Sequence, residues 1–126
     1  MFGMGKRDRE LDAAVRELAR ADTLAFGGVG IASQVLPVTE AYRQVERALD
    51  EHPDEARKKV DWLLEHASPA GRAYAATLLE RIDPEAARGA WTALRDDRGE
   101  FTTFTGCVMG TATLGEYAGD RLSGRS

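Results

Sequence analysis

The sequence predicts an all-α protein of about six helices, and two observations carry that prediction. The four prolines are evenly spaced, one every fifteen or sixteen residues, at Pro37, Pro53, Pro69 and Pro84. Proline is tolerated in the first turn of a helix, where its missing N–H has no partner, and it disrupts a helix interior. Between these prolines, apolar residues recur at the helical period. Each proline therefore marks the start of a helix of about three turns.

Composition and charge limit the class of protein. The 126 residues fit a single domain, and a chain of this length can bury enough surface to fold without a disulfide or a metal. A formal net charge of −4 argues against general binding to nucleic acids or anionic membranes. The single cysteine, Cys107, excludes an internal disulfide and favours a reducing compartment. The charged N-terminus lacks a secretory signal, and no apolar run is as long as a membrane span. We therefore expect a cytoplasmic protein.

Residues 1–36 are predicted to add an N-terminal helix and a glycine-rich connection to the core. Within residues 6–22, apolar residues recur at helical spacing with charges between them, which predicts an amphipathic helix with one narrow apolar stripe. That helix is expected to end near residues 22–23.

The connection over residues 24–36 is an apolar run that contains Gly27, Gly28 and Gly30. Its glycines begin a phosphate-cradling G-x-G pattern, but Ser33 occupies the third glycine position and no βαβ unit is predicted around it. We interpret the segment as a flexible connection whose apolar side chains, Phe26 among them, cover one end of the core. A nucleotide-binding loop and a partner-docking loop are the alternatives.

Residues 37–118 are predicted to form a core of helical hairpins. Four of the helices are expected over residues 38–51, 53–67 and 69–82, and from Pro84 to a turn at residues 96–99. The helix at 69–82 is apolar on most sides, which predicts that it lies at the centre of the core. Ser68 and Asp83 are expected to cap the helices that follow them. On the helix at 53–67, acid-before-base pairs are expected between Asp54 and Lys58 and between Glu55 and Lys59.

Residues 100–118 carry conflicting signals. Their threonines, phenylalanines and glycines favour strands and turns. Their apolar positions also fit a helical stripe, and the repeat length predicts a helix here, so we assign one. Gly106 and Gly110 would each weaken that helix by about 1 kcal/mol relative to alanine. Residues 119–126 are expected to form a flexible tail.

The region from residue 53 to residue 112 contains an internal repeat, because Ala56, Arg57 and Leu63 recur as Ala87, Arg88 and Leu94. Within it, residues 71–97 resemble the HEAT-like repeat, in particular its short phycobilin-lyase-type version. The positions that carry the resemblance are Arg72, Ala75, Ala76, Leu79, Ile82, Asp83, Pro84, Glu85, Ala86, Leu94 and Asp97. Residues 100–118 depart from it, with Thr102 where the family has an arginine, which indicates a terminal capping unit.

The resemblance implies a short right-handed stack of helices that serves mainly as a protein-binding scaffold. Some members of the family bind cofactors or DNA, or act as lyases on bilins. Because one fold can serve many functions, the function has to be inferred from the chemistry of particular residues.

No catalytic constellation and no metal-binding pattern is found in the sequence. His52 and His66 are the only histidines, and each is expected at a helix C-terminus, where the helix dipole favours a partly charged imidazole. They do not form a metal-binding HxxxH or HExxH pattern. Cys107 lies in an apolar setting without a basic neighbour, which predicts a buried and inert thiol. We therefore expect no catalytic residue, no metal and no cofactor.

Three side chains stand out as candidates for an interaction surface: Trp62, Arg72 and Phe26. Trp62 falls beside the apolar stripe of its helix, so it is either an edge of the core or an exposed anchor for a partner, since tryptophan is enriched in binding hot spots. Arg72 either lines a surface together with Arg57 and Arg88 or is simply a solvated charge.

The leading hypothesis is a non-enzymatic scaffold or regulator that binds another protein through one face of the helical stack. The alternative is a small-molecule-binding protein or a small enzyme that uses the Gly27–Gly30 loop over the helical core. A concave surface that shows Trp62 would favour the first, and a pocket near the loop with polar groups from Tyr42, Arg72 or His66 would favour the second. A third possibility is self-association through Phe26 and the stripe of the N-terminal helix.

Overall fold

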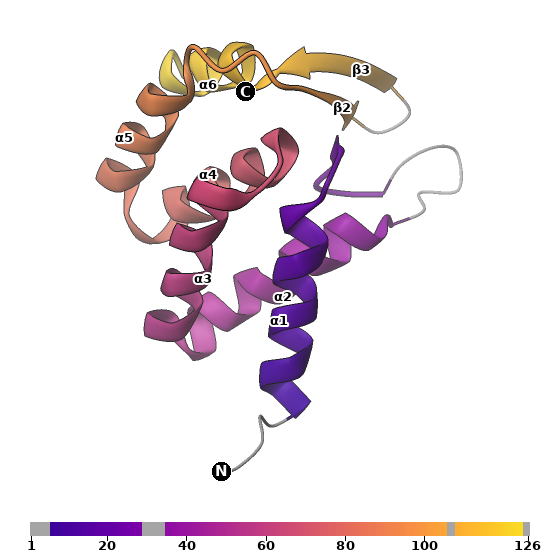
Figure 1. The fold of residues 1–126 in the computed structure, drawn as a ribbon, viewed down its shortest axis with the longest axis vertical. Coiled ribbons are helices and arrows are strands. Elements are labelled where there is room, and N and C mark those ends of the chain that lie inside the picture. Colours follow the sequence, from indigo (N-terminus) through magenta and orange to yellow (C-terminus); the bar gives the residue numbers. More distant parts are fainter. Residues whose placement is uncertain (1–5, 29–34, 106–107, 125–126) are drawn as a thin grey trace.

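The computed structural model describes residues 6–28, 35–105 and 108–124. In these residues the chain forms six helices and a small three-stranded sheet (Figure 1). In chain order the elements are α1 (Lys6–Ala19), β1 (Thr23–Leu24), α2 (Pro37–Glu51), α3 (Pro53–His66), α4 (Pro69–Ile82), α5 (Pro84–Leu94), β2 (Glu100–Thr105), β3 (Val108–Thr113) and α6 (Leu114–Leu122). The protein is therefore mostly helical, as predicted, but it is not purely all-α.

The prolines mark the helix starts as predicted, since each of the helices α2 to α5 has its proline in the first turn. The predicted caps of α4 and α5 are also confirmed. The Ser68 hydroxyl accepts the N–H of Gly71 at 3.1 Å, and the Asp83 carboxylate accepts the N–H of Ala86 at 3.1 Å. Each cap provides a partner for one of the N–H groups that a helix start leaves unsatisfied.

Helix α4 is the centre of the core, as its nearly all-round apolar sequence predicts. It packs against the other five helices and against β1 and β2. Its buried residues are Ala70, Gly71, Ala73, Tyr74, Ala75, Ala76, Leu78 and Leu79. Helix α1 comes so close at Gly71 that a Cβ there would lie 2.3 Å from the Leu18 carbonyl oxygen. Only glycine fits this crossing of the two helices.

The prediction of a helix over residues 100–118 is wrong, because most of this segment forms two strands. The strands β2 and β3 form an antiparallel hairpin in which Phe101 faces Ala112 and Thr102 faces Thr111. The short strand β1 pairs in parallel with the other side of β2, and the Thr102 N–H donates to the Asp22 carbonyl oxygen at 3.0 Å. The strand preference of the threonines and phenylalanines prevails here because β1, far away in the sequence, completes the sheet.

The C-terminal helix begins after the hairpin. Thr113 and Glu116 form a reciprocal capping box, in which the Thr113 hydroxyl accepts the Glu116 N–H at 3.1 Å and the Glu116 carboxylate accepts the Thr113 N–H at 3.0 Å. The helix α6 continues to Leu122. The first part of the segment expected as a tail is therefore helical.

Figure 1 shows α4 surrounded by the other helices, with the β2–β3 hairpin and α6 across one end of the molecule. The helices α1 and α3 lie toward the other end, where they contact each other. None of the described helices combines the length and the apolar character that a membrane crossing requires.

Candidate functional site

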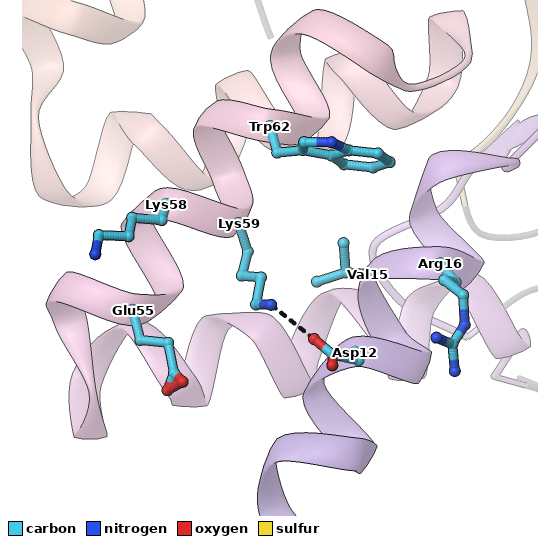
Figure 2. Close-up of a pocket in the computed structure, with 7 residues that line it drawn as sticks. All are labelled: Asp12, Val15, Arg16, Glu55, Lys58, Lys59 and Trp62. Carbon is cyan, nitrogen blue, oxygen red and sulfur yellow. Dashed lines mark ion pairs between the residues drawn. The ribbon is translucent and has the colours of Figure 1, made fainter. Parts of the chain in front are cut away.

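A groove of about 390 Å³ runs between α1 and α3 (Figure 2). We call it the α1–α3 groove. Three of its residues come from α1 and four from α3: Asp12, Val15, Arg16, Glu55, Lys58, Lys59 and Trp62. Three of these side chains are cationic and two are acidic, so the groove has a slight positive excess on a chain whose formal net charge is −4.

Trp62 forms the most apolar wall of the groove. Its position lies beside the buried face of α3, which consists of Ala56, Val60 and Leu63, and 47% of its surface is exposed. Figure 2 shows the indole facing Val15 of α1 across the groove. One turn further along α3, the His66 ring lies 5.0 Å from the indole ring. Trp62 is therefore a surface residue beside the core rather than a buried part of it.

An ion pair between Lys59 and Asp12 crosses the floor of the groove. The Lys59 Nζ atom lies 2.7 Å from the Asp12 Oδ1 atom, and both side chains are about one third exposed or less. The predicted pair between Glu55 and Lys59 is thus replaced by a contact with another helix. The predicted pair between Asp54 and Lys58 does not form either. The Lys59 side chain ties α3 to α1 instead of stabilising its own helix.

The two remaining cations, Lys58 and Arg16, have no ion pair within the described residues. Figure 2 shows that they extend outward from opposite sides of the groove, one from each helix. Glu55 is the only acid of the lining without an ion pair among these residues. The groove therefore combines an exposed indole and an apolar wall with two cations that remain available for an external partner.

A second concave region, of about 570 Å³, lies where α2, α4 and α6 meet β1 and β2. We call it the aromatic cavity, because its walls include Phe26, Tyr42, Phe104 and Tyr117. Polar and charged atoms come from Arg43, Glu46, Thr77, Thr103, Thr105 and Arg121. The Arg121 guanidinium is held by the Glu80 carboxylate, which also accepts the Trp91 indole N–H at 2.8 Å.

Phe26 is held at this cavity by an aromatic cluster. Its ring centroid lies 5.0 Å from that of Tyr42 and 5.3 Å from that of Tyr74. The Tyr74 hydroxyl accepts the Ala25 N–H at 2.8 Å and donates to the Ala25 carbonyl oxygen at 3.0 Å. The Thr39 hydroxyl donates to that same oxygen at 2.7 Å. Phe26 thus packs against two tyrosines at the edge of the core, with 38% of its surface exposed.

Burial controls the ionisation of these phenols. It raises the pKa of Tyr42 to about 12, with the Glu46 carboxylate adding to the shift, and it raises the pKa of Tyr74 to about 12 against the opposing effect of its hydrogen bond to Ala25. Burial also raises the pKa of Tyr117. At neutral pH all three phenols therefore keep their protons and cannot act as bases.

The other predicted site residues lie apart from the groove. The Arg72 guanidinium donates to the Asp97 carboxylate at 3.4 Å and to the Glu65 carbonyl oxygen at 3.3 Å, so it joins the end of α3 to the turn after α5. Gly27 and Gly28 follow Phe26 near the aromatic cavity, and a Cβ on Gly27 would meet open space. Gly30 and Cys107 lie outside the described residues. Trp62, Arg72 and Phe26 do not converge on one site.

Sequence reasoning missed three features: the buried Thr39 hydroxyl, the Tyr74 bond to Ala25 and the Glu80 bridge between Trp91 and Arg121. Each joins residues from different elements, and no short-range pattern signals such a pair.

In the part of the chain that the structure describes, no group of three or more histidine, cysteine, aspartate or glutamate side chains could hold a metal ion. Comparison with protein-family models, curated proteins and solved structures gives no significant match.

Proposed function

We propose that this chain is a non-enzymatic protein-binding module and that the α1–α3 groove is its contact surface. The observation that carries the proposal is the exposure of Trp62, which is 47%, compared with 2% for Trp91 on α5. Large apolar side chains at the surface of a groove are typical of interaction sites, and tryptophan is among the residues most enriched in binding hot spots.

The charges of the groove indicate the chemistry of the partner. An apolar side chain of the partner would cover Trp62 and Val15, and its carboxylates would reach Lys58 and Arg16, which have no ion pair within the described residues. An arginine can hold a carboxylate through two parallel hydrogen bonds, which adds direction to the contact. The partner is therefore an acidic segment with at least one large apolar residue.

The HEAT-like resemblance fits a scaffold of this kind. The helices α2 to α5 begin at regularly spaced prolines, and each packs on the next one along the chain. In such a stack each repeat packs on its neighbours, and the stacked helices together present an extended binding surface. We propose that α4 and α5 support the surface that α1 and α3 present.

Affinity capture tests the proposal. The tagged wild-type chain and a Trp62→Ala variant are exposed to lysate of the native host, and the captured proteins are quantified by mass spectrometry. The loss of a hot-spot tryptophan costs about 2 kcal/mol or more, which is about thirtyfold in Kd, so a specific partner should be strongly depleted from the variant. Lys58→Glu should weaken the same partner, since it places an acid opposite the partner's carboxylates.

Ile82→Ala is the matched control. Ile82 is another exposed large apolar residue, at the end of α4 and outside the groove, with 39% of its surface exposed. The control should retain the partner at the wild-type level. A partner that binds the wild type, Trp62→Ala and Lys58→Glu equally well would contradict the groove as the contact surface.

The aromatic cavity supports a second candidate function, the binding of a small and mainly apolar molecule. Its volume, about 570 Å³, lies within the range of ligand sites, and its walls combine aromatic rings with threonine hydroxyls and three charged side chains. Because the Tyr42 phenol stays protonated at neutral pH, it would donate a hydrogen bond to such a ligand.

The fluorescent dye 1-anilinonaphthalene-8-sulfonate, which has apolar rings and one sulfonate group, separates the two candidates. Binding in the aromatic cavity should be weakened by Phe104→Ala and left unchanged by Trp62→Ala. Equal binding to both variants and to the wild type would place the dye elsewhere and remove the support for a ligand in this cavity.

A further inference from the structure

The outer edge of β3 is unpaired within the described residues. The sheet has the order β1–β2–β3, so β2 is paired on both sides while β3 is paired on one side only. Figure 1 shows β3 as the outermost strand, with β2 between it and the rest of the sheet. An edge of this kind presents a row of backbone N–H and C=O groups that another strand can pair with.

The hydrogen-bond pattern identifies the residues whose backbone faces outward. The Thr102 N–H donates to Asp22 on the β1 side, so the backbone of Thr102 does not face β3. Thr102 and Thr111 are therefore a pair without mutual hydrogen bonds in the antiparallel ladder, and the N–H and C=O of Thr111 face away from β2. The same holds two residues earlier for Met109, which lies opposite Phe104.

Three devices by which proteins commonly protect an edge strand, namely charged residues, proline and a bulge, are missing from β3. Residues 108–113, with the sequence VMGTAT, contain no charged residue and no proline, and their pairing with β2 continues without a bulge. Val108 and Met109 are 69% and 67% exposed. The edge is thus uncharged and has apolar side chains beside its open backbone groups.

We propose that a second copy of this chain pairs with β3, antiparallel and edge to edge, so that the two sheets join into one. A two-fold axis at Gly110 places the outward-facing Met109 of each copy opposite the outward-facing Thr111 of the other, and each such pair exchanges two hydrogen bonds. Met109 and Thr111 then become cross-strand neighbours on one face of the joined sheet, which covers part of the exposed Met109 side chain.

Self-pairing fits this edge better than pairing with a charged partner. The edge is complementary to itself in the register given above, and the residue on the axis, Gly110, has no side chain to obstruct the approach. Each copy has a formal net charge of −4, but residues 108–113 contain no charged residue, so no like charges lie directly opposite each other at the shared edge. The β3 edge shares no residue with the α1–α3 groove, so the dimer would leave both grooves open.

Sedimentation velocity over a concentration series tests the proposal, with Thr111→Pro and Thr111→Val as matched variants. We expect the wild type to reach a mass twice that of the chain. Proline at position 111 removes an outward-facing N–H and leaves the bonds to β2 in place, so it should shift the protein to monomer at every concentration. Valine keeps the N–H and is a good strand former, so it should dimerise like the wild type.

A second variant covers the case in which Thr111→Pro fails to fold, as judged by circular dichroism. Met109→Lys leaves the backbone intact and places one positive charge of each copy at the shared edge, which should weaken the dimer at least tenfold. Hydrogen exchange should show protection of the Met109 and Thr111 amides that rises with concentration in the wild type.

Three results would overturn the proposal. One is a wild-type chain that remains monomeric up to its solubility limit. Another is a dimer that persists in both Thr111→Pro and Met109→Lys, since its interface would then lie elsewhere. The third is a monomer whose Thr111 amide becomes protected only when a different protein is added, because the edge would then serve a different partner.

Discussion

Tyr74 and Trp62 are both large aromatic residues on neighbouring helices, and the fold uses them in opposite ways. Tyr74 is fully buried in α4, and its hydroxyl both accepts a hydrogen bond from Ala25 and donates one to it. Trp62 on α3 is 47% exposed, and its ring contact is with His66, one turn away on the same helix. The buried residues of α4 thus stabilise the fold, whereas the α1–α3 groove has exposed side chains that a partner could contact. Stability and binding should therefore respond to different substitutions.

The largest loss of stability is expected from Leu78→Ala in α4. Leu78 is fully buried, and truncation of a leucine at such a site lowers the free energy of unfolding by about 2 to 5 kcal/mol, because it removes apolar contacts and leaves a cavity. Urea denaturation measures this loss. Trp62→Ala, truncated at an exposed site, should change the free energy of unfolding by less than about 1 kcal/mol. Equal losses in the two variants would break the contrast between interior and groove.

Tyr74→Phe should have the next largest effect. It keeps the ring in the core and removes the hydroxyl, which leaves the Ala25 N–H without its partner. An unsatisfied buried group of this kind costs about 1 to 3 kcal/mol. Tyr42→Phe is the control, because the Tyr42 hydroxyl has no hydrogen bond to a described residue. Thermal and urea denaturation of the two variants should differ accordingly.

Alkaline pH should destabilise the interior. Tyr42 and Tyr74 have a pKa of about 12 in the folded protein, compared with the ordinary value of about 10 for tyrosine. Because the folded pKa is the higher one, the stabilising contribution is fully present below about pH 10 and is lost as the pH rises toward 12. Urea denaturation at several pH values should show a shallower loss for Tyr74→Phe than for the wild type. An identical pH dependence would contradict the burial of this phenol.

The smallest effect is expected at the floor of the groove. Lys59→Met keeps the length of the side chain and removes the ion pair with Asp12. The Lys59 side chain is 34% exposed and the Asp12 side chain 24%. Pairs of this exposure stabilise a protein by about 1 kcal/mol or less. Lys58→Met, at a lysine without an ion pair in the described part of the chain, should leave the free energy of unfolding unchanged. The double variant Asp12→Asn with Lys59→Met would show whether the two losses are coupled.

The helical part of the fold could be predicted because its signals are local. Proline fixes its own backbone angle and lacks an N–H, so the starts of α2 to α5 can be read from single residues. Ser68 and Asp83 satisfy N–H groups only a few residues away. The burial of α4 follows from its sequence, which is apolar on most sides.

The hairpin and the groove depend on contacts that no local pattern contains. Phe101 and Ala112 fit a helical stripe in the sequence, yet they are direct partners across two strands, and β2 is completed by β1 from the opposite end of the chain. Trp62 could be recognised as a candidate from its place beside the apolar stripe. The ion-pair partner of Lys59 could not be recognised from the sequence. Asp12 lies on another helix, and Glu55, one turn away on the same helix, is an equally plausible partner.

Tryptophan fluorescence tests most directly whether Trp62 is the anchor of the α1–α3 groove. The chain has two tryptophans, and Trp91 is 2% exposed, so acrylamide quenching of the free protein reports mainly on Trp62. Addition of the captured partner, or of an acidic peptide derived from it, should markedly reduce the quenching, because the partner covers the indole. If the partner binds and the quenching stays at the level of the free protein, the α1–α3 groove is not the contact surface.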